Sequence, residues 1–162
     1  MITAAIILAE AAVLYEGLQA VQSQSYGPEA RGGASRSDVI ISDSDILYPK
    51  VIQPNVLICL TQEAYNTYYS ILRPGGLLLM DSRYVKKTFR VDARQVVLPI
   101  YRTVMDQIGN PVVTNICMLG TVLGLTDLVR PESISKVLET RVPEDYLEMN
   151  QKALELGLNL TS

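Results

Sequence analysis

Residues 56–81 read VLICLTQEAYNTYYSILRPGGLLLMD, and this stretch decides the fold class. It begins with the apolar run VLICL and closes with LLLM, and such continuous runs are typical of strands covered on both faces of a sheet. Between them Thr61 is suited to cap a helix over 62–72, and the Pro-Gly-Gly sequence that follows ends that helix. The order strand, helix, strand predicts a βαβ unit with parallel strands.

The rest of the chain alternates in the same way. The first helix, expected over 2–17, is apolar around most of its circumference, which predicts that it is buried. Further strands are expected over 18–23, 35–42 and 95–100, and further helices over 101–108, over 112–125 and from Pro131 and Pro143 onward. Strands that alternate with helices, followed by a helical C-terminal part, predict an α/β fold with a mostly parallel sheet.

Length and composition restrict the function classes. The 162 residues predict one domain, and the net charge of −3 without a basic stripe argues against a nucleic-acid binder. The chain has no histidine, and its two cysteines, Cys59 and Cys117, stand alone among aliphatic residues. This excludes Ser-His and Cys-His nucleophiles and leaves no metal-ligand set, so we expect no metal on this chain. No segment is suited to a signal peptide or a membrane span, and unpaired thiols fit a cytoplasmic location.

The loop around residues 25–36 holds the best candidate for a binding site. It lies within SQSYGPEARGGASRSDVI, between two expected strands. Arg31 and Arg36 are donors suited to phosphate or carboxylate, and Gly32-Gly33 permits close approach of the backbone to a ligand. The alternative, a β-connection with the arginines paired to Glu29 and Asp38, is favoured slightly by the pattern alone, because no complete phosphate-binding motif is present.

Three other polar groups are ambiguous from the sequence. Asn115 lies inside an apolar helix and needs a hydrogen-bond partner, either backbone or a neighbouring subunit. Tyr65, Tyr68 and Tyr69 share one helix face, which is typical of packing and also of a protein interface. Asp81 follows a buried strand, at the edge of the sheet where α/β proteins place ligands.

Several blocks of the chain, in order, resemble one known family. The blocks are ITAAIILAEAA, VQSQSYGPEARGGASRSDVIIS, NVLICLTQEAYNTYY, LRPGGLLLMDS and GNPVVTNICMLG. Together they resemble the gamma subunit of 2-oxoacid:ferredoxin oxidoreductases, within the pyruvate/ketoisovalerate oxidoreductase catalytic-domain family and nearest to the 2-oxoglutarate (2-ketoglutarate) type. The resemblance implies a Rossmann-like three-layer fold over a single domain, residues 1–162.

The resemblance also implies a function for the assembled complex. That complex converts a 2-oxoacid and CoA to acyl-CoA and carbon dioxide while it reduces ferredoxin, with thiamine diphosphate and iron–sulfur clusters on alpha, beta and delta-type partners. This chain would be a non-autonomous subunit without a cofactor of its own, and a homo-oligomer is possible when it is isolated. Contact with CoA or with a partner subunit is expected at Ser25, Tyr26, Gly27, Arg31, Gly32, Gly33, Ser35, Arg36 and Asn115.

Two alternative functions remain open, and the sequence differs from the family pattern in one respect. The chain could instead be an assembly module that docks the thiamine-enzyme subunits without a chemical role, or an independent nucleotide-binding domain. The family also carries a strand and a GxGGQG loop before its first helix, whereas here the helix follows directly on Met1. We therefore expect that strand and loop to be missing.

Overall fold

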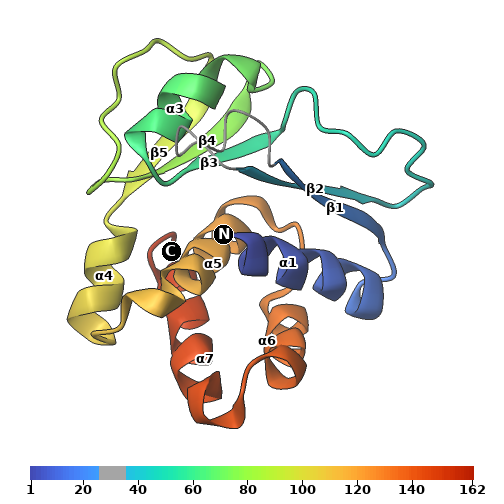
Figure 1. Ribbon diagram of the computed structural model, residues 1–162, viewed down its shortest axis with the longest axis vertical. Coiled ribbons are helices and arrows are strands. Elements are labelled where there is room, and N and C mark those ends of the chain that lie inside the picture. Colours follow the sequence, from blue (N-terminus) through green and yellow to red (C-terminus); the bar gives the residue numbers. More distant parts are fainter. Residues whose placement is uncertain (26–35) are drawn as a thin grey trace. The chain divides into compact units, whose positions relative to one another are not determined.

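The computed structural model describes residues 1–25 and 36–162, and Figure 1 shows their helices and strands along the chain. These residues form two compact units. The sheet unit comprises residues 24–25, Arg36 and Val51–Pro99, and the helical unit comprises Met1–Ser23, Ser37–Lys50 and Ile100–Ser162. The expectation of a single domain stays a prediction.

The sheet unit is built from the stretch that decided the fold class. Its elements are β3 (Val56–Cys59), α3 (Gln62–Tyr68), the 3-10 turn η1 (Tyr69–Ile71), β4 (Gly76–Asp81) and β5 (Ala93–Leu98). β4 lies between β3 and β5 and is parallel to both, so the predicted βαβ unit is confirmed. Thr61 caps α3 as expected, since its Oγ1 accepts a hydrogen bond of 3.1 Å from the Ala64 backbone N–H. The α-helix ends at Tyr68, four residues before the expected end at residue 72, and the chain continues as the 3-10 turn.

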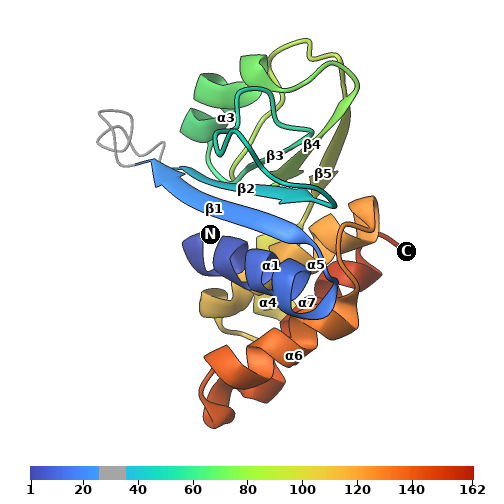
Figure 2. The same ribbon diagram turned by 90° about the vertical axis from the view of Figure 1, so that its right-hand side faces the viewer.

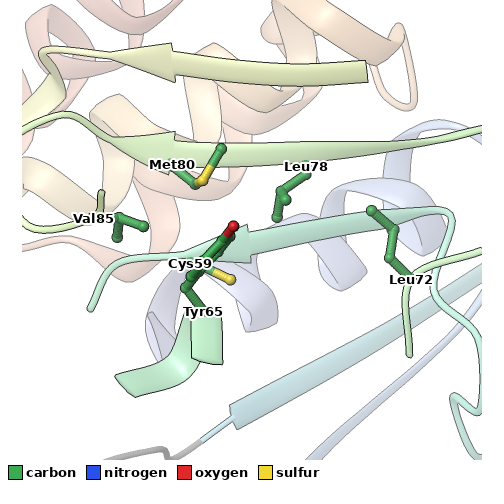
Figure 3. Packing of buried hydrophobic residues seen from close by; sticks show 6 residues of the cluster. All are labelled: Cys59, Tyr65, Leu72, Leu78, Met80 and Val85. Atoms are coloured by element: carbon green, nitrogen blue, oxygen red, sulfur yellow. The ribbon is translucent and has the colours of Figure 1, made fainter. Parts of the chain in front are cut away.

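One face of this sheet packs against α3. Figure 3 shows the core, in which side chains from β3, β4, α3 and the following segments meet. Its buried members are Cys59, Tyr65, Leu72, Leu78, Met80 and Val85. Leu77 and Leu79, which alternate with them along β4, are buried too. β4 is therefore covered on both faces, as its continuous apolar run predicted, and each fully buried side chain of this size contributes about 2 kcal/mol to stability.

The helical unit contains most of the remaining elements. They are α1 (Ile2–Tyr15), β1 (Gln19–Ser25), β2 (Arg36–Ser42), α4 (Ile100–Gln107), the 3-10 turn η2 (Pro111–Val113), α5 (Thr114–Thr126), α6 (Pro131–Arg141) and α7 (Glu144–Asn159). β1 and β2 form a two-stranded sheet of their own and run in opposite directions, as Figure 2 shows. Residues 24–25 and Arg36, at the ends of these two strands, belong to the sheet unit.

Two glycines let α5 and α7 pack backbone against backbone. A Cβ on Gly120 would collide with the carbonyl oxygen of Leu154, and one on Gly157 would collide with that of Cys117. All the residues of α5 from Ile116 to Leu123 are buried, which confirms the buried helix expected there. Only glycine leaves room for so close an approach of two helices, so this contact determines where α7 lies on α5.

α1 departs from the expectation of full burial. It buries a stripe of small and branched residues, but Val13 and Leu14 are 48% and 64% exposed. Its buried stripe is formed mainly by alanines, and α1 packs against α5 and α6. None of the helices in the described part of the chain is long and apolar enough to cross a membrane.

Ion pairs join α1 to α6. Glu10 accepts two hydrogen bonds from the Arg141 guanidinium, and these lower the pKa of its carboxyl. The pKa of Glu16 is also lowered, first by a 2.5 Å hydrogen bond from the Ser133 hydroxyl and then by Arg130, whose Nε lies 3.0 Å away. The two carboxylates therefore stabilise this contact while they are ionised.

Candidate functional site

The candidate site is the contact loop, residues 25–36, of which the structure describes the two ends. Six of its predicted contact residues lie outside the described residues: Tyr26, Gly27, Arg31, Gly32, Gly33 and Ser35. Ser25 ends β1 and Arg36 begins β2, and these strands pair with each other. Near this point the Gln22 amide donates to Ser37 Oγ over 2.9 Å, and Ser37 Oγ lies 3.4 Å from the Ser23 carbonyl oxygen. The two strands that flank the contact loop are therefore paired with each other.

Arg36 has a defined place at the end of the contact loop. Its guanidinium carbon lies 5.5 Å from the centre of the Tyr68 ring, within range of a cation–π contact. Its Nη2 also lies 3.5 Å from the Val51 carbonyl oxygen, so the side chain rests on α3 and on the segment before β3. Because a guanidinium keeps its charge at all physiological pH values, this holds a permanent positive group at the base of the contact loop.

Asn115 belongs to the helical unit, whereas Ser25 and Arg36 belong to the sheet unit. It lies in the first turn of α5, where its Oδ1 accepts a 2.9 Å hydrogen bond from the Ile116 backbone N–H. Asn110, just upstream, caps η2 through the N–H of Val112 at 3.0 Å. The partner that Asn115 needs is therefore supplied by backbone, and its contact with CoA or with a partner subunit stays a prediction.

The other polar groups have structural partners. Asp81, at the carboxyl end of the central strand β4, is 1% exposed and accepts a 2.8 Å hydrogen bond from the Arg83 backbone N–H. Tyr65 and Tyr68 are buried, which agrees with a packing face for the tyrosine stripe. Among residues 1–25 and 36–162, no group of cysteine, aspartate and glutamate side chains is arranged to hold a metal ion.

Sequence reasoning overlooked one candidate surface. Exposed cations lie on the segment that follows β4, among them Lys86, Lys87 and Arg90. The net charge of the whole chain conceals them, because the acids that balance them are concentrated elsewhere in the sequence. A count of charge by segment would have found them.

A three-stranded parallel sheet that packs against α3, in a chain whose strands alternate with helices, defines a Rossmann-like α/β protein. Comparison with known proteins identifies the group: the chain belongs to the pyruvate ferredoxin/flavodoxin oxidoreductase family, which it matches over residues 1–160. The predicted family resemblance and fold class are both confirmed.

Individual relatives agree with this assignment. The chain is 45% identical over 159 residues to 2-oxoglutarate synthase subunit KorC of Methanocaldococcus jannaschii, covering 97% of this chain and 85% of that one. It superposes on the crystal structure of a keto/oxoacid ferredoxin oxidoreductase gamma subunit from Geobacter sulfurreducens with a TM-score of 0.89 and 44% identity, covering 99% of this chain and 90% of that one.

A larger protein contains the same fold. The 2-oxoglutarate:ferredoxin oxidoreductase of Magnetococcus marinus, solved with 2-oxoglutarate, coenzyme A and succinyl-CoA bound, matches with a TM-score of 0.80 and 16% identity. The match covers 98% of this chain and 28% of that one. At this level of identity the similarity concerns the fold alone.

Proposed function

We propose that this chain is the gamma-type subunit of a 2-oxoglutarate:ferredoxin oxidoreductase. The complex would oxidatively decarboxylate 2-oxoglutarate, form succinyl-CoA and transfer the electrons to ferredoxin. The observation that carries this proposal is the 45% identity to a 2-oxoglutarate synthase subunit over 97% of the chain. The gamma-subunit structure that superposes with a TM-score of 0.89 supports the same role.

In this proposal the chain depends on partners for the chemistry. It has no histidine to act as a base and only two cysteines, both buried as free thiols. Thiamine diphosphate and the iron–sulfur clusters would be bound by alpha, beta and delta-type subunits, and the isolated chain would be inactive. Free thiols also support a cytoplasmic location for the complex.

The first test is assembly and substrate preference. A tagged copy of the chain, expressed in its native host, should co-purify with thiamine-dependent subunits. The purified complex should reduce ferredoxin with 2-oxoglutarate at a kcat/KM at least about tenfold above that for pyruvate or 2-ketoisovalerate, a difference of about 1.4 kcal/mol in transition-state binding. Recovery of the chain without such partners would contradict the proposal, and a preference for pyruvate would contradict the substrate.

We assign the contact loop a role beside CoA or the catalytic partner. Support comes from Arg36, whose side chain is positioned by Tyr68 and the Val51 carbonyl group. A planar cation positioned in advance binds a phosphate or carboxylate with less loss of side-chain entropy than a mobile one.

The double variant Arg31→Ala, Arg36→Ala separates the two roles of the loop. If the loop contacts CoA, the complex still assembles and its KM for CoA rises about tenfold or more. If the loop docks a partner, assembly itself is lost, which would favour the alternative of an assembly module. Arg102→Ala is the matched control, because Arg102 is 80% exposed in the helical unit and pairs only weakly with Asp106 at 3.6 Å.

A further inference from the structure

The segment that connects β4 to β5 and begins β5, residues 83–94, carries a concentration of positive charge. We name it the cationic segment. It holds five basic residues and one acid, Asp92, and all six are exposed. The basic residues are Arg83, Lys86, Lys87, Arg90 and Arg94. This corrects the expectation that the chain lacks a basic stripe.

Side chains of α3 hold the backbone of the cationic segment in place. The Gln62 side chain makes two hydrogen bonds to the backbone of Lys86: Oε1 accepts from its N–H at 2.7 Å, and Nε2 donates to its carbonyl oxygen at 3.1 Å. The adjacent Val85 is 4% exposed and belongs to the core of the sheet unit. The backbone at Lys86 is therefore held from one side by hydrogen bonds and from the other by burial.

Tyrosines of the same helical stretch hold the next turn. The Tyr65 hydroxyl accepts hydrogen bonds from the backbone N–H groups of Thr88 at 3.2 Å and Phe89 at 3.0 Å. The Phe89 ring stacks on Tyr69, with ring centres 4.2 Å apart and planes within 5°. The cations on either side are thus carried by an ordered backbone, and ordering in advance reduces the entropy lost on binding.

Lys86, Lys87 and Arg90 have no acidic partner within the part of the chain that the structure describes. The cations of the helical unit differ, because Arg102, Arg130 and Arg141 are paired with acids of that unit. The sequence ranges of the two units differ in the same sense. Among the described residues, Lys and Arg number seven against three Asp and Glu in the sheet unit, and six against thirteen in the helical unit.

We propose that the cationic segment docks onto an acidic face of a partner subunit in the same oxidoreductase complex. This inference rests on the proposed function, since it names the surface through which the subunit is bound. The charges are distributed over twelve residues of chain, with Tyr84 and Phe89 45% and 41% exposed among them. Arginine, tyrosine and phenylalanine are the residue types enriched in protein interfaces. The segment also lacks the glycine-rich turn or helix N-terminus with which proteins usually hold a phosphate group.

The test measures how tightly the full chain binds the remaining subunits of the complex, purified without it. The triple variant Lys86→Ala, Lys87→Ala, Arg90→Ala should raise the dissociation constant about tenfold or more at about 50 mM NaCl. At about 300 mM NaCl screening weakens the wild-type contact, so the difference should shrink to about threefold. The control Arg102→Ala, Lys136→Ala, Lys152→Ala removes the same charge from the helical unit and should change the dissociation constant less than about twofold.

Failure of this inference can be told apart from failure of the proposed function. If the wild-type chain does not bind the other subunits at all, the proposed function fails. If wild type and triple variant bind equally, the docking surface is wrong. Thermal unfolding checks that the triple variant is folded. Should it not be, the salt dependence of the wild-type dissociation constant decides, because salt-independent binding contradicts an electrostatic surface.

Two further measurements test whether the cationic segment binds a different ligand or a second copy of the chain. Calorimetric titration of the isolated chain with inorganic pyrophosphate tests a polyphosphate ligand. Sedimentation of the isolated chain tests binding to a second copy. Either binding reaction, if it disappears in the triple variant while the affinity for the other subunits is unchanged, overturns the proposed partner.

Discussion

The helical unit and the sheet unit place their charged groups in opposite ways. In the helical unit, Arg130 and Arg141 are paired with Glu16 and Glu10, so charge holds α6 against α1. In the sheet unit, Gln62 and Tyr65 hold the backbone while Lys86 and Lys87 extend into solvent. The net charge of −3 therefore describes neither unit. Charge serves cohesion in one unit and is available for recognition in the other.

Packing differs between the units as well. The helical unit relies on glycines that bring two helix backbones together, whereas the sheet unit relies on large side chains that fill the space between α3 and the sheet. Glycine contacts tolerate no added atom, while a core of large side chains loses stability gradually as single groups are removed.

Gly157→Ala should be the most damaging small change in the helical unit. Its new methyl group would overlap the Cys117 carbonyl oxygen, and we expect the free energy of unfolding to fall by about 3 kcal/mol, despite the higher helix propensity of alanine. Urea denaturation followed by circular dichroism measures this. Gly17→Ala is the control: that position has open space but a φ of +67°, and we expect a loss of about 1 kcal/mol. Equal losses in the two variants would show that α7 can shift away from α5.

Tyr65→Phe tests how the cationic segment is held in the sheet unit. Removal of the hydroxyl leaves the N–H groups of Thr88 and Phe89 without their acceptor, at a cost of about 1–2 kcal/mol. Hydrogen exchange at these two amides should accelerate. Tyr69→Phe is the matched control, because the Tyr69 hydroxyl makes no hydrogen bond among the described residues, and we expect a change below about 0.5 kcal/mol. Similar exchange rates in the two variants would contradict the role of Tyr65.

Acid should weaken the contact between α1 and α6. The pKa values of Glu10 and Glu16 are lowered in the folded chain, so their contribution to stability is present above the ordinary value of 4.5 and is lost as the pH falls through the folded pKa values. The midpoint of thermal unfolding should therefore drop by a few degrees below about pH 4.5. Glu10→Gln should reduce this drop, while Glu155→Gln, an exposed acid on α7, should leave it unchanged. A wild-type midpoint that is constant down to about pH 3 would contradict the stabilising role of these ion pairs.

The reactivity of the two cysteine thiols measures local opening of each unit, and it should be the smallest of these effects in the folded chain. Burial raises the pKa of Cys59 to about 12, and both Cys59 and Cys117 are fully buried. Neither should react with a thiol reagent at about pH 8 in the folded chain, and both should react in guanidinium. Because one cysteine lies in each unit, reaction of one thiol alone at low denaturant would show which unit opens first.

Local signals in the sequence were sufficient to predict the helices and strands of the sheet unit and the α/β fold class. The run VLICL, the Thr61 cap and the run LLLM each act within a few residues, and the structure contains the strand, helix and strand that they predicted. The contact loop was predicted in the same way, from glycine and arginine between two expected strands, and its role stays a prediction. The sequence did not predict that one side of α1 is exposed, because the burial of a helix face depends on which other elements pack against it in the folded chain.

The α/β class and the family could be inferred from the amino-acid sequence, since both depend on residues that are neighbours along the chain, and the same kind of signal predicts the contact loop. The tertiary structure alone decided which charges are paired and which remain available. Glu16 meets Arg130 across 114 positions, and Gln62 meets Lys86 across 24. Such pairs leave no periodic pattern in the sequence, because their geometry arises only when the elements between them have folded and packed.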